Sequence, residues 1–320
     1  MTEYLEIKTI LNMRYKLRVL PMHEIGKRDN QEDCMYPSMD SLSDSCRSFV
    51  VCDGLGGHDS GEVASAAVCR AIGAYVEKHC NMGVFCNDDF LKALGAAYDE
   101  LDACDTGARK KMGTTMTFLN FGTAGCLVAH IGDSRVYHMR PGDGILFETR
   151  DHSLVNDLLK MGELTPEEAK VFPQRNTVTR CMQPGREVRP KADIRHIADV
   201  RAGDYFFMCS DGVNEVLESC DLAGVILDTA LTDEEKMVAL VQGTAEARDN
   251  HTAFLVHVLD VVHEPGDGTA TAVAGNRAGM ELPLPESNTS VLGKCKASVC
   301  WLVLSAVVLL LAVAALFFLL

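Results

Sequence analysis

Short runs of β-branched and aromatic residues, bounded by glycine or aspartate, recur between about Arg14 and Val261 and predict β-strands. Several runs follow one another directly from Thr114 to Thr149, which favours antiparallel pairing over β-α-β crossovers. The predicted strands are Ser48–Asp53, Thr114–Asn120, Gly125–Gly132, Arg135–Met139, Ile145–Thr149, Asp204–Ser210 and Thr252–Asp260.

Helical periodicity appears in three longer segments. They are Gly61–His79, Asp89–Asp102 and Asp233–Ala247. In the first of them, Val68, Ile72 and Val76 fall on one face. Two T-x-x-E capping boxes mark helix starts, at Thr165 and at Thr232. Strands grouped centrally with helices beside them predict one α+β domain, residues 1–262, in which stacked sheets have helices outside them.

The end of the chain has a different pattern. Ala297–Leu320 contains no charged residue, and the 22 residues from Val299 to Leu320 would span roughly 33 Å as a helix, enough for a hydrocarbon core of about 30 Å. We therefore expect a single transmembrane helix over residues 297–320. Lys294 and Lys296 precede it, so the positive-inside rule places the remaining chain on the cytoplasmic side of the membrane. Residues 263–296, rich in Gly, Ala, Thr, Pro and Ser, read as a flexible linker.

Charge and cysteine usage exclude some classes of protein. The formal net charge is −15, and so acidic a chain lacks the basic surface that nucleic-acid binding requires. The 13 cysteines form no C-x-x-C pair, so neither a disulfide framework nor a thiolate zinc site is indicated. Reduced thiols in a cytosolic compartment are expected.

Acidic residues occur beside glycine at strand ends, which is where chemistry is expected. Asp53-Gly54, Gly132-Asp133 and Asp211-Gly212 follow predicted strands, and Asp249 precedes the last one. Any one Asp-Gly pair is readily explained as a turn. Several carboxylates gathered at one rim would instead repel one another unless a divalent cation neutralised them. Oxygen ligands alone favour Mg²⁺ or Mn²⁺ over zinc.

Eight short motifs surround these positions, in order along the chain. They are Gly26–Asp33, Val50–His58, Gly113–Thr117, Ile131–Arg135, Asp151–Leu154, Asn176–Arg180, Cys209–Val213 and Ala247–Thr252. In order and spacing they resemble the metal-dependent serine/threonine protein phosphatases of the protein phosphatase 2C family, most of all the compact bacterial type. The resemblance covers about Met22 to Val261. It implies an α+β four-layer sandwich of two antiparallel β-sheets flanked by helices.

The resemblance also implies a centre of two Mn²⁺ or Mg²⁺ ions at one end of the sandwich. Asp53 matches the carboxylate that bridges both ions, and Gly54 matches the residue whose carbonyl oxygen binds one of them. Asp211 and Asp249 match ligands of the first ion, and Glu32 matches the carboxylate beside the second.

Further positions are implied in the same way. Asp33 matches a polar position counted with the metal-binding residues, and Asn250 matches a supporting residue. Asp133, together with Asp211, resembles a third metal site of bacterial-type members. Arg28 matches the arginine that grips the substrate phosphate.

The general acid departs from the family pattern. Animal-type members place a histidine two residues after the bridging aspartate, where this chain has Leu55. His58 is the nearest substitute and suits proton donation near neutral pH, although a purely structural role is an equal alternative. His152 is expected to be structural. Ser153–Val171 resembles the flap beside the metal centre, with a break at Gly162, and substrate choice is expected to reside there.

The implied activity is hydrolysis of phosphoserine and phosphothreonine on proteins by a water that bridges two metal ions. The partners are then phosphorylated proteins and, as a candidate, an opposing serine/threonine kinase. Two alternatives stay open at this point. One is a catalytically silent, membrane-tethered adaptor that binds phosphoproteins, and the other is a hydrolase of small phosphate esters.

Overall fold

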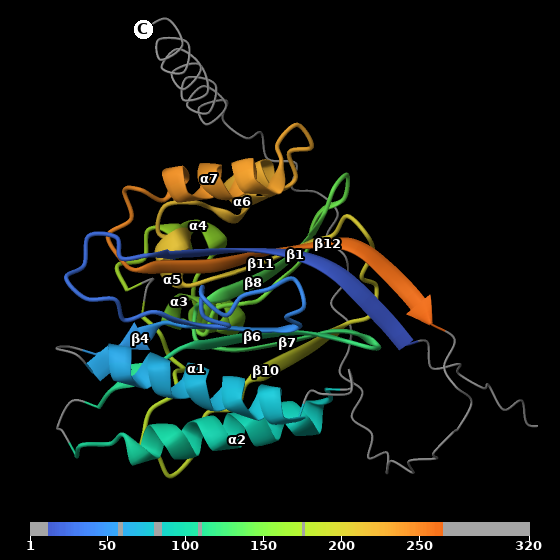
Figure 1. Ribbon diagram of the computed structural model, residues 1–320. Helices are drawn as coiled ribbons and strands as arrows, with labels where there is room; N and C mark the ends of the chain where they lie inside the picture. The colour runs from blue at the N-terminus through green and yellow to red at the C-terminus, as the bar shows by residue number, and fades with distance from the viewer. Residues whose placement is uncertain (1–11, 57–59, 80–84, 108–110, 175–176, 265–320) are drawn as a thin grey trace, which may run out of the picture. The chain divides into compact units, whose positions relative to one another are not determined.

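Two five-stranded antiparallel sheets form the centre of the computed structural model, which describes residues 12–56, 60–79, 85–107, 111–174 and 177–264 (Figure 1). The first sheet has the order β1 (Asn12–Glu24), β12 (His251–Glu264), β11 (Tyr205–Cys209), β8 (Arg135–Arg140), β9 (Gly144–Glu148). The second has the order β10 (Asp193–Ile197), β7 (Gly125–Ile131), β6 (Met116–Gly122), β3 (Ser48–Cys52), β2 (Cys34–Tyr36). A short pair, β4 (Gly54–Leu55) and β5 (Gly113–Thr114), extends beyond β3.

Strand β3 shows why the domain is layered. All five of its residues are buried. Because successive side chains point to opposite faces, Phe49 and Val51 pack between the sheets, whereas Val50 and Cys52 face the helices. Aromatic rings join the sheets across the core, with the Phe49 ring 5.3 Å from that of Phe254.

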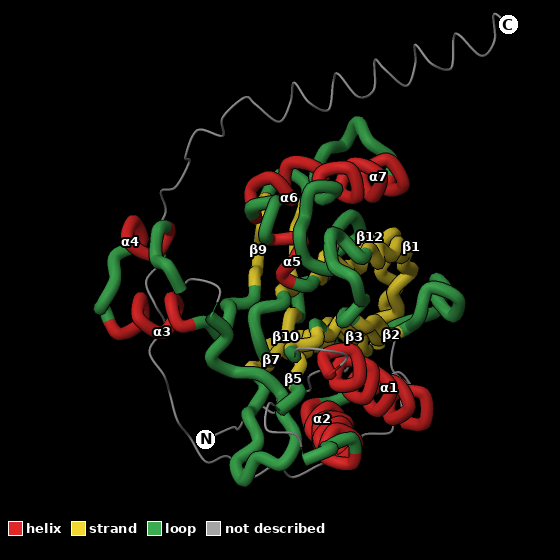
Figure 2. Tube along the Cα trace, turned by 90° about the vertical axis from the view of Figure 1, so that its left-hand side faces the viewer, coloured by secondary structure: helices red, strands yellow, loops and turns green. Residues whose placement is uncertain are grey.

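Helices cover both outer faces, so the expected four layers are confirmed. Helices α1 (Ser60–His79) and α2 (Asn87–Ala103) pack on the second sheet. Helices α6 (Ser219–Ile226) and α7 (Asp233–Gly243) pack on the first, and Figure 2 shows the four layers from the side. The single turn α5 (Asp211–Asn214) follows β11.

The predicted flap lies outside these layers. Helix α3 (Leu154–Met161) ends at Gly162, whose φ of 74° is left-handed, and α4 (Pro166–Lys170) begins at the Thr165 capping box. Neither helix has a buried residue, and both project from the sandwich at the left of Figure 2. The helix, glycine break and second capped helix expected from the sequence are confirmed.

Some boundaries differ from the sequence analysis. Four of the described strands were not predicted: β1, β2, β4 and β10. In β1, buried Tyr15, Leu17 and Val19 alternate with exposed basic residues, so the segment does not stand out as a strand in the sequence. Its pairing with β12 along the whole strand holds it in the extended conformation. The predicted Thr114–Asn120 strand is divided between β5 and β6, and α7 ends at Gly243 rather than at Ala247.

The C-terminal predictions lie outside the described residues. Among the residues that the structure describes, no helix is both long enough and apolar enough to cross a bilayer. The predicted transmembrane segment 297–320 and nearly all of the 263–296 linker fall in the part that is not described, as does His58. None of the ten cysteines in the described part of the chain forms a disulfide.

Candidate metal centre

Acidic side chains from distant parts of the chain meet at one end of the sandwich. Asp53 follows β3, Asp133 follows β7 and Asp211 follows β11, while Asp33 lies just before β2. Burial raises the pKa of Asp53 well above its usual value, and the neighbouring charges of Asp211, Asp33 and Asp133 raise it further. The sequence analysis expected Asp53, Asp133 and Asp211 to gather at one rim, and in the structure they lie close enough for their charges to act on one another, with Asp33 added to the group.

The cluster is short of positive charge. Burial, and then the charge of Asp211, raises the pKa of Asp133 to about 8, and burial raises that of Asp33 to about 7. One carboxylate oxygen of Asp133 and one of Asp211 are buried without a hydrogen-bond partner in the described part of the chain. Buried polar atoms are rarely left unpaired, and several close carboxylates repel one another. Divalent cations would satisfy both needs, so these residues fit the metal centre.

The backbone at Asp53 is clamped by the GTT segment that follows in the fold. The carbonyl of Asp53 accepts hydrogen bonds from the Thr115 amide and the Thr114 hydroxyl, both at 2.9 Å. Its own amide donates to Thr115 Oγ1, which also contacts Ser134 Oγ at 2.7 Å. The end of β3 is therefore tied to the loop that carries Asp133.

Two glycines allow α1 to approach the acidic group. A Cβ on Gly54 would lie 2.4 Å from the backbone of Gly61 and 2.6 Å from the carbonyl oxygen of Glu32. A Cβ on Gly61 would lie 2.9 Å from the Glu32 carboxyl carbon. Ser65 of α1 donates to the Glu32 carbonyl at 2.6 Å. The start of α1 thus presses against Gly54 and Glu32, and a larger residue at either glycine would force them apart.

Asn250 holds the loop that carries Arg28 and Glu32. Its side-chain oxygen accepts from the Glu32 amide at 2.7 Å, and its side-chain nitrogen donates to the carbonyls of Ile25 and Asn30. Asn250 thus joins the backbone of Ile25, Asn30 and Glu32, on both sides of Arg28. Asp33 is held separately, because its Oδ2 accepts a 2.7 Å hydrogen bond from Ser210.

Arg28 lies at the exposed edge of the same group. Its guanidinium donates to Asp249 Oδ2 at 2.6 Å, and this hydrogen bond raises the arginine pKa. Asp249 Oδ1 accepts from the Asn250 amide at 2.9 Å. The residue expected to grip phosphate and one expected to bind metal are therefore partners in this structure.

A cavity of about 510 Å³ opens beside these residues. Arg28, Asp133, Asp211 and Asp249 line one part of it, and Glu215 and Arg248 line another. The sequence analysis gave no role to either of the last two: Glu215 lies outside every motif, and Arg248 lies in the motif Ala247–Thr252, where only Asp249 and Asn250 were given one. Two further lining residues, Arg135 and Asp151, form a bidentate ion pair with both contacts at 2.7 Å, and each lies in a motif noted above.

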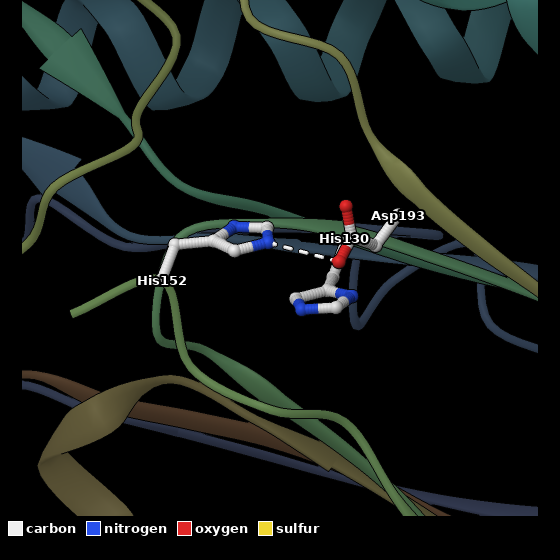
Figure 3. Close-up of side chains that lie close together, drawn as sticks. All are labelled: His130, His152 and Asp193. Atoms are coloured by element: carbon white, nitrogen blue, oxygen red, sulfur yellow. Dashed lines mark ion pairs between the residues drawn. The ribbon is translucent and has the colours of Figure 1, made fainter. Parts of the chain in front are cut away.

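A second group of potential ligands lies apart from the carboxylates. His130, His152 and Asp193 place their ligand atoms within 4.8 Å of one another (Figure 3). The two imidazole rings are stacked, with centroids 4.6 Å apart and planes 6° from parallel, so in-plane nitrogen lone pairs of both rings do not converge on one ion. Arg180 already supplies a cation there, 2.8 Å from Asp193.

The same contacts define the role of His152. It accepts a hydrogen bond from the Gly132 amide at 3.0 Å and pairs with Asp193 at 3.3 Å. His152 is thus a structural residue, as expected. In the described residues no three carboxylates come as close as this trio. A wider spacing of the carboxylates suits a centre of two metal ions, because the ions of such centres lie about 3.5–4 Å apart and divide the ligands between them.

A two-sheet sandwich whose end gathers buried carboxylates, with an arginine beside them, defines a metal-dependent hydrolase of phosphate esters. Comparison with known proteins narrows this class. The family model for protein phosphatase 2C matches residues 30–260. Protein phosphatase PhpP of Streptococcus pneumoniae is 30% identical over 233 residues, which cover 72% of this chain and 92% of PhpP.

Solved structures agree. The crystal structure of the Mycobacterium tuberculosis serine/threonine phosphatase PstP/Ppp superposes with a TM-score of 0.64 at 29% identity, covering 76% of this chain and 98% of that one. A structure of the PstP catalytic domain in complex with two manganese ions gives a TM-score of 0.62 at 29% identity, covering 76% and 99%. The chain belongs to the protein phosphatase 2C family and is a protein-serine/threonine phosphatase.

Proposed function

We propose that this phosphatase holds two Mn²⁺ or Mg²⁺ ions in its carboxylate group and uses them to hydrolyse phosphoserine and phosphothreonine on proteins. The observation that carries the proposal is the pair of buried, unpartnered oxygens on Asp133 and Asp211. The two manganese ions of the PstP complex support the number and the kind of ion.

The proposed ligand roles are those that the family resemblance implies. Asp53 would bridge the two ions, and the carbonyl of Gly54 would bind one of them. Asp211 and Asp249 would hold the first ion, and Glu32, with Asp33 as a neighbouring polar group, would lie beside the second. Asp133 would hold a third ion together with Asp211.

Bound metal ions supply an activated water and neutralise charge on the phosphoryl oxygens. The chain's own residues bind and orient the substrate. Arg28 presents a planar guanidinium at the cavity, suited to two phosphoryl oxygens at once in a way that lysine is not. His58 is proposed to protonate the departing serine or threonine oxygen. Asn250 holds Glu32 and the Arg28 loop in place through its three hydrogen bonds.

The membrane part of the proposal depends on sequence alone. We propose that residues 297–320 anchor the protein as a single transmembrane helix, with the phosphatase domain on the cytoplasmic side and residues 263–296 as the linker. The uncharged run to Leu320 and the lysines before it support this. Phosphoproteins near the membrane, among them those of an opposing serine/threonine kinase, are the proposed substrates.

Hydrolysis of phosphopeptides tests the enzymatic proposal. The purified chain in detergent should release phosphate from phosphoserine and phosphothreonine peptides with Mn²⁺ or Mg²⁺, and EDTA should stop the reaction. Asp53→Asn should lower the rate by about 10³-fold or more, because it weakens the binding of both ions. Full activity in EDTA would refute the metal centre. Binding of phosphopeptides without any release of phosphate would favour an adaptor.

A further inference from the structure

Arg248 is an exposed arginine in the lining of the catalytic cavity, directly before Asp249. Two other arginines of this cavity are already engaged: Arg28 with Asp249 and Arg135 with Asp151. The guanidinium of Arg248 has neither a hydrogen bond nor an ion pair within the part of the chain that the structure describes. A guanidinium without a protein partner, beside a site for anionic substrates, can bind an anionic group of the substrate.

The backbone of Arg248 is held in place although its side chain is not. Its amide donates to Glu215 Oε2 at 2.9 Å, and its carbonyl accepts from the Lys27 amide at 3.2 Å. The next amide, that of Asp249, also faces Glu215 Oε2, at 3.4 Å. The hydrogen bonds therefore fix the backbone from which the Arg248 side chain extends, and the next residue, Asp249, is a proposed metal ligand.

Two glutamates also line the cavity with Arg248. The Glu215 carboxylate accepts the two amides just described, and backbone N–H donors stabilise its negative charge. Glu218 is the N-cap residue of α6, where its amide donates to Asp221 Oδ2 at 3.2 Å. Neither pairs with the Arg248 guanidinium in the described structure.

Distance limits what Arg248 could contact. Neighbouring Cα atoms are about 3.8 Å apart, and an extended peptide advances about 3.3–3.6 Å per residue. With the phosphoryl group at the metal ligands, the substrate positions within reach of Arg248 are those one or two residues from the phosphoresidue. An arginine at such a point favours carboxylate or phosphate, since its fork matches two anionic oxygens.

We propose that Arg248 is a specificity-determining residue that binds a second anionic group on the substrate, one or two residues from the phosphoserine or phosphothreonine. The group is a carboxylate of Asp or Glu, or a second phosphate. The inference rests on the proposed function. It is sharpened by the overall charge of −15, because so acidic a protein repels acidic peptides in general and needs a local cation to prefer them.

Matched phosphopeptides test the proposal with the full chain in detergent and Mn²⁺. A phosphothreonine peptide with alanine neighbours is the reference. Its relatives carry one glutamate, or one second phosphothreonine, at positions one or two residues before or after. The readout is the ratio of kcat/KM for each anionic peptide to that of the reference. We expect a ratio of about three- to tenfold at one or more positions at low salt, shrinking as salt is raised.

Three variants give the contrast. Arg248→Ala should bring the ratio to about one, and Arg248→Glu should invert it. Arg195→Ala is the matched control, since Arg195 is an exposed arginine on β10 outside the cavity lining, and it should keep the wild-type ratio. If the kcat/KM ratio rises with glutamate, Arg248 recognises anionic groups in general. If it rises only with the second phosphate, Arg248 recognises doubly phosphorylated sites.

The inference and the proposed function fail in different ways. Turnover of the alanine peptide by the wild type establishes the phosphatase activity by itself. With that turnover intact, a wild-type ratio near one at every position, or an unchanged ratio in Arg248→Ala, overturns the role of Arg248 alone. Absence of turnover on every peptide overturns both.

Discussion

The guanidinium of Arg28 donates to Asp249 Oδ2 at 2.6 Å while the Asn250 amide donates to Asp249 Oδ1 at 2.9 Å, so both oxygens of this proposed metal ligand are engaged. A cation that binds Asp249 must take a position beside one of these donors. Phosphate, in turn, needs the guanidinium free. Metal binding and release of Arg28 toward substrate are thus expected to favour each other.

Replacement of Arg28 separates its two roles. Arg28→Ala should tighten Mn²⁺ binding several-fold, because the competing cation is gone, and should lower kcat/KM on phosphopeptides by about 10²-fold or more. Isothermal titration calorimetry of Mn²⁺ and steady-state kinetics measure the two effects. Arg28→Lys, which keeps the charge without the fork, is the control. Weaker Mn²⁺ binding in Arg28→Ala would contradict the competition.

Removal of one buried charge at Asp211 should affect the metal-free and metal-bound proteins in opposite ways. Burial raises the pKa of Asp211, and one of its oxygens lacks a partner in the described structure. Asp211→Asn should therefore leave the metal-free Tm unchanged or raise it, and should abolish the increase in Tm that Mn²⁺ produces in the wild type. Thermal denaturation with and without Mn²⁺ measures both. A variant that loses stability without metal would argue against an uncompensated charge.

The stability of the metal-free protein should fall as pH rises. The pKa of Asp33 is raised from 3.8 to about 7, and that of Asp133 from 3.8 to about 8. Between about pH 4 and pH 8 the folded chain therefore holds more protons than the unfolded chain. The free energy of unfolding then decreases with pH, by about 2 kcal/mol per pH unit around pH 5–7, because each of the two groups contributes up to about 1.4 kcal/mol per unit.

Urea denaturation at several pH values measures this slope. Saturating Mn²⁺ should flatten or reverse it, since the ions take the place of the protons and bind better once the carboxylates are ionised. A metal-free stability that rises steadily from pH 5 to pH 8 would show that the carboxylate group does not control the balance.

A buried ion network around Asp204, at the opposite end of β11 from Asp211, should matter for stability only. Burial alone would raise the pKa of Asp204, but hydrogen bonds from Arg140 and His138 outweigh it and hold the pKa at about 2. Asp204→Ala leaves the buried partners without their anion and should cost about 3 kcal/mol or more of unfolding free energy. Equilibrium urea denaturation is the measurement.

The contribution of Asp204 should be present above pH 3.8 and disappear as pH falls toward 2, because the folded pKa is depressed. Asp199→Ala is the control. Asp199 is 62% exposed and contacts the same Arg140, so its removal should change stability little. Equal losses in the two variants would contradict the assignment of the buried contact.

Deletion of Ala297–Leu320 tests the membrane anchor. The shortened protein should appear in the soluble fraction after ultracentrifugation and should keep its activity on phosphopeptides, because the described domain contains the whole carboxylate group. The full chain should sediment with membranes and be released by detergent. A shortened protein that still sediments with membranes would show a second attachment.

The sequence allowed Asp53, Asp133, Asp211 and Asp249 to be predicted as a group, since each follows or precedes a strand recognisable by its β-branched and aromatic residues. Glu32 and Asp33 were assigned only through the family resemblance, because the short strand after them was not recognised. The pairing of Arg28 with Asp249 could not be predicted, because it joins loops 221 residues apart that are brought together only by the pairing of β1 with β12. Glu215 escaped notice for a similar reason. Glu215 accepts hydrogen bonds from two amides more than thirty residues later in the chain. A single glutamate after a helical turn forms no sequence motif that would indicate such contacts.

Strand β1 was missed for a different physical reason. Its basic residues alternate with apolar ones on a strand at the edge of its sheet, and such a segment resembles a charged terminus until the position of its partner is known. The pairing that orders it, Asn12 with Glu264 at one end and Glu24 with His251 at the other, is as non-local as any in the chain.

Strand β12 also determines where the chain leaves the described domain. β12 begins beside Asp249 and runs 14 residues to Glu264, a path of up to about 45 Å at the usual rise per residue. The polypeptide thus leaves the domain at the pole remote from the carboxylates. The described domain therefore carries Asp249 and its own last residue, Glu264, at opposite ends of one continuous strand.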